Sequence, residues 1–194
     1  LGSGDPLPAA HQAAVSGGLR FKRLGSVIGH TICGITDDDR LFCWGRGDLG
    51  QLGAGAPDSC YGGPCAAAPV AIMPDTRFRS VSTGPSHACA VSLEGEAWCW
   101  GLNGEENRLG STAVARAPGA NSEPVRITVD ARFTEVSTGH DHACALAVDT
   151  TVWCWGSNAH GQLGAGLATE WWLPSQVLGS FNQTPLGFLS ISSG

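Results

Sequence analysis

A phrase built from two cysteines and a Trp-Gly pair occurs three times in this chain and constrains its fold more than any other feature. In each copy the second cysteine follows the first by ten residues and is itself followed by Trp-Gly. The three pairs are Cys33 and Cys43, Cys89 and Cys99, and Cys144 and Cys154. The copies recur about every 55 residues, which is the length of one supersecondary unit in a repeat protein. The sequence therefore predicts a repeat architecture before it indicates any activity.

A phenylalanine opens each copy of the longer repeat. These residues are Phe21, Phe78, Phe133 and Phe188. The Trp-Gly pair is followed by a glycine-rich return, which reads Gly-Gln-Leu-Gly at 50–53 and again at 161–164. We predict an extended tether over residues 1–20 and a repeat domain over residues 21–194. Its repeats are expected at 21–77, 78–132 and 133–187, with the start of a fourth at 188–194.

Composition favours an all-β fold of short strands. The chain has 28 glycines, 11 prolines and one methionine, and it shows no apolar stripe of helical period. Leu93-Glu94-Gly95 predicts a hairpin turn, because its glycine stands where a three-residue loop needs a positive φ. Asp37-Asp38-Asp39 and Val148-Asp149-Thr150 occupy the same place in the other copies. This turn sets a register in which the two cysteines of each copy lie opposite one another.

The same register sorts the remaining side chains, because they alternate between the two faces of a sheet. One face carries the cysteines, and the other carries tryptophans opposite alanines, which is complementary cross-strand packing. The expected pairs are Ala88 with Trp100, Ala90 with Trp98, Ala143 with Trp155, and Ala145 with Trp153. We therefore predict a structural repeat core that contains Trp44, Trp98, Trp100, Trp153, Trp155 and the recurrent His30, His87 and His142. The first copy has one more residue between its histidine and its cysteine, which predicts a bulge there.

Directly opposed strand positions bring cysteines within disulfide range, at Cα separations of roughly 4.4 to 6.8 Å. We predict the bridges Cys33–Cys43, Cys89–Cys99 and Cys144–Cys154, and a fourth bridge, Cys60–Cys65, that closes a surface loop. The alternative is a metal site. Structural zinc sites favour close cysteine pairs that converge from two places, whereas each pair here is contained in its own hairpin. We therefore predict no metal and an oxidising compartment, periplasmic or extracellular.

From Phe21 onward the chain resembles the regulator of chromosome condensation repeat family. The resemblance rests on His87-Ala88-Cys89-Ala90-Val91, Trp100-Gly101, Trp155-Gly156 and the Gly-Gln-Leu-Gly return at 161–164. It implies a β-propeller of four-stranded blades, and the paired cysteines look like the secreted bacterial branch of the family. That family usually closes a ring of seven repeats. We therefore expect a partial, open-arc or truncated propeller, which is either the ordered part of a longer chain or a natural arc. The resemblance is specific for the fold and says little about activity.

Trp171 and Trp172 are the candidate partner-binding residues, because they lie outside the repeated hairpin and exposed tryptophan is enriched at interface hot spots. The alternative is burial of both rings between blades. Arg46-Gly47-Asp48 is the tripeptide read by cell-adhesion receptors, but it falls in a variable return where such a tripeptide arises by drift. Asn182-Gln183-Thr184 fits the glycosylation pattern, although Pro185 disfavours its use. Asp37-Asp38-Asp39 could suggest calcium, yet acidic residues are ordinary at hairpin tips.

Charge and motif content restrict the function. Eleven basic and seventeen acidic residues, without a basic cluster, disfavour nucleic acid and anionic membrane surfaces as partners. No apolar stretch is long enough to span a bilayer. The sequence contains neither a nucleophile elbow nor a phosphate-binding loop, so we predict no enzyme activity and no cofactor.

We therefore expect a disulfide-braced interaction module or structural accessory subunit that docks on another protein. A membrane-associated complex, approached from its extracytoplasmic side, is the expected kind of partner. The alternative is a propeller-type enzyme inhibitor or a secreted protein that binds or acts on glycans. An enzyme would need unrepeated carboxylates or histidines that converge on a pocket.

Overall fold

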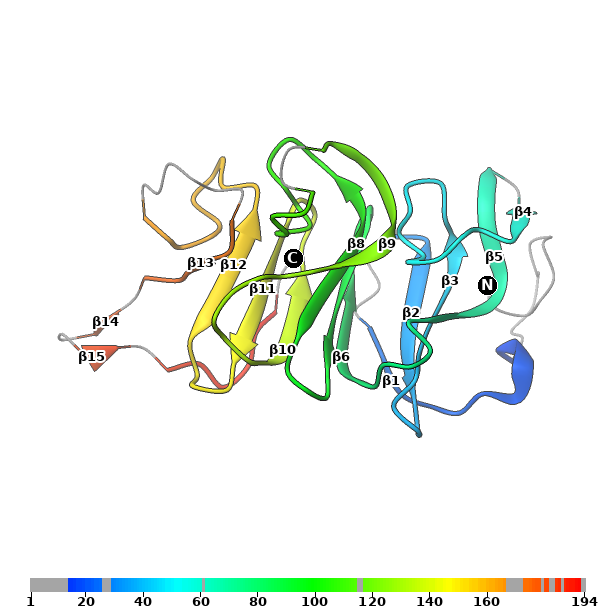
Figure 1. Ribbon diagram of the computed structural model, residues 1–194, viewed down its shortest axis with the longest axis horizontal. Coiled ribbons are helices and arrows are strands. Elements are labelled where there is room, and N and C mark those ends of the chain that lie inside the picture. Colours follow the sequence, from blue (N-terminus) through cyan, green and yellow to red (C-terminus); the bar gives the residue numbers. More distant parts are fainter. Residues whose placement is uncertain are drawn as a thin grey trace.

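The computed structural model describes residues 14–25, 29–60, 62–114, 117–166, 173–178, 180–181, 184–185 and 187–192. Three antiparallel sheets dominate these residues and stand side by side along the longest axis of the molecule (Figure 1). The described residues contain a single short helical element, the 3-10 turn η1 (Ser16–Gly18). The sheets form an open arc and not a closed ring. The predicted all-β, open-arc fold is confirmed.

The strands follow one another in sequence order in the second and third sheets, whereas in the first sheet β5 lies between β3 and β4. The first sheet contains β1 (Phe21–Leu24), β2 (Thr31–Thr36), β3 (Leu41–Arg46), β4 (Asp58–Cys60) and β5 (Gly63–Ile72), in the order β1-β2-β3-β5-β4. The second contains β6 (Phe78–Thr83), β7 (His87–Ser92), β8 (Ala97–Asn103) and β9 (Gly119–Arg126). The third contains β10 (Phe133–Thr138), β11 (His142–Ala147), β12 (Val152–Gly156) and β13 (Ser175–Gln176). A separate two-stranded ribbon joins β14 (Ser180–Phe181) to β15 (Thr184–Pro185).

The predicted hairpin register is present in all three sheets. Cys33 lies opposite Cys43, and Cys89 lies opposite Cys99. The alanine and tryptophan partners are also those predicted: Ala88 with Trp100, Ala90 with Trp98, Ala143 with Trp155, and Ala145 with Trp153. The hairpin turns explain why the register holds. Asp39, Gly95 and Thr150 have φ values of 66°, 83° and 69°, so the third turn residue takes the left-handed conformation even where it is not glycine.

The eight cysteines form the four predicted disulfides. Three of them join directly opposed strand residues with Cα separations of 4.1 Å: Cys33–Cys43, Cys89–Cys99 and Cys144–Cys154. The fourth, Cys60–Cys65, closes the β4–β5 turn with a Cα separation of 5.8 Å. The structure contains no free cysteine.

One kind of apolar interface joins neighbouring sheets. The cysteine face of each sheet packs against the tryptophan face of the next. Between the first and second sheets the members include Cys33, Cys43, Phe78, Ala88 and Trp100. Between the second and third they include Cys89, Cys99, Phe133, Ala143 and Trp155. The cysteine face of the third sheet is covered by its own return loop and by the later segment that contains Phe188 and Ile191.

The first copy departs from its predicted register at one position. The β2–β3 ladder runs without a shift from Thr31 opposite Gly45 to Ile35 opposite Leu41, so the predicted bulge before Cys33 is wrong. The register shift between Phe21 and Arg23 of β1 is common to all three copies, since β6 and β10 have it at the same place. The extra residue therefore pushes His30 off the strand. Thr31 is buried in the place that histidine occupies in the other copies, and His30 is exposed.

Candidate functional site

The arc has two rims of different character. We call the first the return-loop rim: the loops 47–57, 104–114 and 157–166 that follow β3, β8 and β12, with the turns 84–86 and 139–141. The second, the hairpin rim, consists of the turns 37–39, 93–95 and 148–150. The two rims lie at opposite ends of the strands (Figure 1). The full segments from these strands to the next strand cover residues 47–57, 104–118 and 157–174, so they differ in length and sequence among the three copies, whereas the hairpin turns all have three residues. Variation is therefore concentrated on one rim.

Glycines of the return loops hold the tryptophans of the next sheet. A Cβ atom on Gly53 would lie 2.8 Å from Nε1 of Trp100, and one on Gly110 would lie 2.4 Å from Cδ1 of Trp155. The Trp100 indole also donates a hydrogen bond of 3.0 Å to the carbonyl oxygen of Gln51. Only glycine allows so close an approach of loop backbone to ring. The last glycine of the return motif is thus an inter-sheet joint in the first two copies.

The tryptophans fall into two groups. Trp44, Trp100 and Trp155 are at most 2% exposed. Trp98 and Trp153 are only partly buried and pack against the edges of the two inter-sheet clusters. Trp171 and Trp172 lie outside the described residues, as do Asn182 and Gln183 of the glycosylation pattern, so those two predictions remain predictions.

The three recurrent histidines also differ in burial. His87 is fully buried opposite Gly101, where a Cβ atom would lie 2.6 Å from the His87 Cα. Burial, followed by the positive charge of Arg108, lowers the pKa of His87 to about 4. His142 is half-buried opposite Gly156, and burial also lowers its pKa. His30 is exposed, so its predicted place in the repeat core is wrong, because the extra residue in the first copy puts Thr31 there instead.

An ion pair connects two sheets beside His87. Nη2 of Arg108, in the return loop of the second sheet, lies 3.0 Å from Oδ1 of Asp141 in the third. The other oxygen of Asp141 lies 2.8 Å from Nδ1 of His140. Neither ring nitrogen of His87 has a hydrogen-bond partner among the described residues. The histidine therefore serves as a neutral packing group and is poorly placed for proton transfer.

The adhesion-like tripeptide is closed on itself. Nε and Nη2 of Arg46 each lie 2.6 Å from an oxygen of Asp48. This bidentate contact raises the pKa of Arg46 and lowers the pKa of Asp48. Gln51 also donates to the Asp48 carboxylate, at 3.3 Å. The two charges that an adhesion receptor would read are therefore directed at each other.

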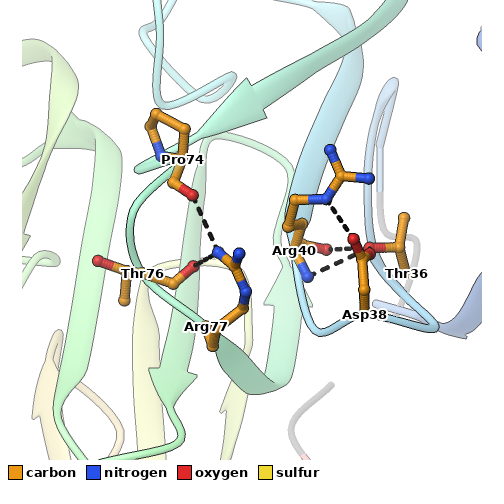
Figure 2. Close-up of polar contacts among 6 residues, drawn as sticks. All are labelled: Thr36, Asp38, Arg40, Pro74, Thr76 and Arg77. Atoms are coloured by element: carbon orange, nitrogen blue, oxygen red, sulfur yellow. Dashed lines mark hydrogen bonds and ion pairs between the residues drawn. The ribbon is translucent and has the colours of Figure 1, made fainter.

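The acidic hairpin turn is also paired internally. Asp38 accepts hydrogen bonds of 2.6 Å from the Thr36 hydroxyl and from Nε of Arg40 (Figure 2). Asp37 and Asp39 face Arg20 and Lys22. On the neighbouring linker, Arg77 donates to the carbonyl oxygens of Pro74 and Thr76 (Figure 2). These carboxylates are engaged by cations and by a turn hydroxyl, which is the ordinary chemistry of an acidic turn.

Among the described residues, an additional hairpin is formed by the first return segment alone. Its outer part forms the β4–β5 hairpin, which the Cys60–Cys65 disulfide closes. A cavity of about 460 Å³ lies beside this hairpin and is lined by His30, Gly45, Arg46, Pro64 and the disulfide, together with Gly62 and Gly63. A second cavity of about 440 Å³ lies on the hairpin rim between the second and third sheets, near Glu96, Arg126 and Arg132. Neither cavity brings together a nucleophile and a base.

The described residues contain no group of three or more histidine, cysteine, aspartate or glutamate side chains arranged to bind a metal. Within the same residues, no helix has the length and apolar character needed to cross a membrane.

Stacked antiparallel sheets of four or five strands, each with a cysteine face and a tryptophan face and joined through glycines of the return loops, define a repeat protein of the β-propeller class. The chain belongs to the regulator of chromosome condensation (RCC1) repeat family. The family repeat matches residues 38–91, 94–146 and 149–194, and a second description of the same repeat matches 78–106 and 133–162.

Relatives of known name include the ultraviolet-B receptor UVR8 of Arabidopsis thaliana, which is 27% identical over 180 residues, covering 91% of this chain and 39% of the relative. The E3 ubiquitin-protein ligase HERC2 of Homo sapiens is 33% identical over 146 residues, covering 73% of this chain and 3% of the relative. The chain thus corresponds to less than half of the length of UVR8 and to a small part of HERC2.

Solved structures show the same fold. Human WBSCR16 aligns with a TM-score of 0.72 at 20% identity, over 87% of this chain and 43% of that structure. Prp20p of Saccharomyces cerevisiae, described together with its binding properties to Gsp1p and histones, aligns with a TM-score of 0.69 at 21% identity, over 83% of this chain and 39% of that structure. At these identities the likeness establishes the fold alone.

Proposed function

We propose that this protein is a non-catalytic interaction module that binds another protein through its return-loop rim in an extracytoplasmic compartment. The observation that carries the proposal is the contrast between the two rims. Sequence variation, the extra hairpin and its disulfide all lie on the return-loop rim, and insertions in repeat proteins map to one face that is often the binding face. The partner we propose is a subunit of a larger, membrane-associated complex.

The scaffold supports recognition at low ordering cost. Three disulfides brace the sheets from within their apolar clusters, and Gly53 and Gly110 hold the first two return loops against the next sheet. A rigid scaffold loses little conformational entropy on binding. Four disulfides and no free cysteine also favour an oxidising compartment. Relatives such as Prp20p, which is described with its binding to Gsp1p and histones, make a protein the natural kind of ligand.

The test compares charge-reversed variants of the two rims in the cells that make the protein. Glu105→Lys with Glu106→Lys alters the return-loop rim, and Glu94→Lys with Asp130→Lys makes the same charge change on the hairpin rim. We expect the unaltered chain to co-purify with one stoichiometric partner, with all its thiols oxidised. Only the return-loop variant should lose that partner. A chain that purifies alone, or that loses the partner equally in both variants, would refute the proposal.

A further inference from the structure

The disulfide of the β4–β5 hairpin differs in its role from the other three. Six cysteines belong to the three apolar clusters or pack against them, whereas Cys60 and Cys65 are in none of the described clusters. The bridge therefore fixes the shape of an exposed hairpin at the edge of the first sheet. Covalent restraint of an exposed segment is a means of preorganising it for binding.

The glycines of this hairpin point to the same conclusion. Gly62 and Gly63 have φ values of 110° and 124°, which disfavour any residue with a side chain. A Cβ atom on either would meet nothing within 4 Å. These glycines thus set the path of the backbone and make no close packing contact, and they leave an open wall on the cavity of about 460 Å³. A space of this size accommodates one or two side chains of a ligand.

The charge beside the cavity selects the ligand. Arg46 lines the cavity, but Asp48 neutralises it through two hydrogen bonds. Asp58 lies opposite Cys65 in the hairpin ladder and is exposed. One of its oxygens accepts the N–H of Ala67 at 2.8 Å, and no cation pairs with it among the described residues. Asp58 does not line the cavity, but Cys65, its partner in the ladder, does. The hairpin beside the cavity therefore carries one negative charge that no described cation neutralises.

The return loop of the second sheet also carries negative charge. Glu105 and Glu106 are exposed, and within the described part of the chain no ion pair involves either of them. A cationic ligand would therefore be attracted along this rim as well as at Asp58. Apart from Arg46, whose charge Asp48 neutralises, the cavity wall consists of glycine backbone, a proline ring, a disulfide and the exposed imidazole of His30, which suits an uncharged side chain.

We propose that the cavity between His30 and the Cys60–Cys65 hairpin binds a basic protein segment in which a lysine or arginine stands beside an apolar side chain. The cation pairs with Asp58, and the apolar side chain enters the cavity. This inference rests on the proposed function and locates its principal contact on the return-loop rim.

The experiment selects random peptides displayed on phage against the immobilised chain and measures the dissociation constant of the consensus peptide. Asp58→Asn removes the charge while its amide oxygen can still accept the Ala67 N–H. Asp130→Asn is the matched control, because it removes an exposed carboxylate from the opposite rim. His30→Trp fills the cavity from an exposed position and leaves the core untouched.

We expect the selected peptides to combine a basic and an apolar residue. The dissociation constant should rise roughly fivefold in Asp58→Asn at low salt, since an exposed charge pair contributes up to about 1 kcal/mol. It should rise more in His30→Trp and stay unchanged in Asp130→Asn. Acidic or unselected peptides, or equal binding to all four proteins, would overturn the inference. The native partner separates this result from the broader proposal: if it still binds His30→Trp, this site is wrong but the interaction function stands.

Discussion

At the scale of single residues, some glycines of the return loops do more than allow the chain to turn, because they also lie directly against a tryptophan ring. Gly53, Gly110 and Gly164 all have positive φ, but only the first two lie against an indole. At Gly164 the nearest atom to an added Cβ is Cγ1 of Val177, at 3.1 Å. At this position of the repeat, glycine is therefore required for its backbone conformation in the third copy. In the first two copies it is required both for that conformation and for its contact with the tryptophan ring.

This distinction can be measured with a matched pair of substitutions. Gly110→Ala would force a methyl group to within 2.4 Å of the Trp155 ring, whereas Gly161→Ala has a similar φ and open space around its Cβ. Both variants incur the cost of a positive φ, and only the first adds overpacking, which typically costs about 1 to 3 kcal/mol. Denaturant unfolding should show Gly110→Ala to be less stable than Gly161→Ala by that amount. Equal stabilities would mean that the loop moves freely away from the ring.

At the scale of secondary-structure elements, the innermost strands are joined by side chains and not by a ladder. The hydroxyl of Ser80 on β6 accepts the N–H of Val136 on β10 at 3.2 Å, and that of Ser82 accepts the N–H of Thr138 at 2.9 Å. Adjacent sheets thereby satisfy buried backbone donors that would otherwise be left unpaired. The outer strands are protected in another way from pairing with a further strand. Pro69 in β5 and Pro124 in β9 interrupt the row of backbone groups that would form that ladder.

Ser82→Ala tests the junction of β6 and β10. The change leaves the buried Thr138 N–H without this acceptor and removes the 2.9 Å contact with the Thr138 hydroxyl. An unsatisfied buried donor costs roughly 1 to 3 kcal/mol, so thermal unfolding should occur at a lower temperature. Ser122→Ala, at an exposed position of β9, is the control and should have almost no effect. If both variants melt alike, the serine contacts do not stabilise the sheet junction.

At the scale of the whole molecule, stability is distributed over repeated interfaces, each between one cysteine face and one tryptophan face. The second interface also contains ionisable groups. His87 is buried close to Arg108, Asp141 and His142, and the Arg108–Asp141 pair bridges the second and third sheets. Protonation of these groups should therefore affect the packing of the second sheet against the third.

Acidification should weaken the folded state through His87. Its pKa is about 4 in the folded protein against an ordinary value of 6.5, so below about pH 6.5 the unfolded chain binds a proton that the folded chain does not. The free energy of unfolding should thus fall as the pH drops from 6.5 towards 4, by roughly 3 kcal/mol at most. His87→Gln should flatten the pH dependence measured by denaturant unfolding, and His160→Gln, at an exposed position, should not. Parallel curves for all three proteins would show that His87 is not the responsible group.

Much of this fold was predictable because its signals are local. A hairpin turn sets the register of the strands that it joins, and alternation then assigns cysteines and tryptophans to opposite faces. The disulfide pairs follow from the same register. His30 shows where local reasoning stops: one added residue moves a recurrent histidine off its strand, and only the position of the strand itself reveals that Thr31 replaces it.

The repeat, the all-β class, the hairpin register and the cysteine pairing could all be predicted from the order of residues, since each depends on residues close together in the chain. The structure was needed to show which glycine contacts which ring, and that a cavity lies between His30 and the β4–β5 hairpin. It was also needed to show that Asp48, and no other group, neutralises Arg46. The first two features depend on distances between separate segments, and the third depends on the competition among several charges for the same partner. Neither quantity is expressed in the order of residues along one strand.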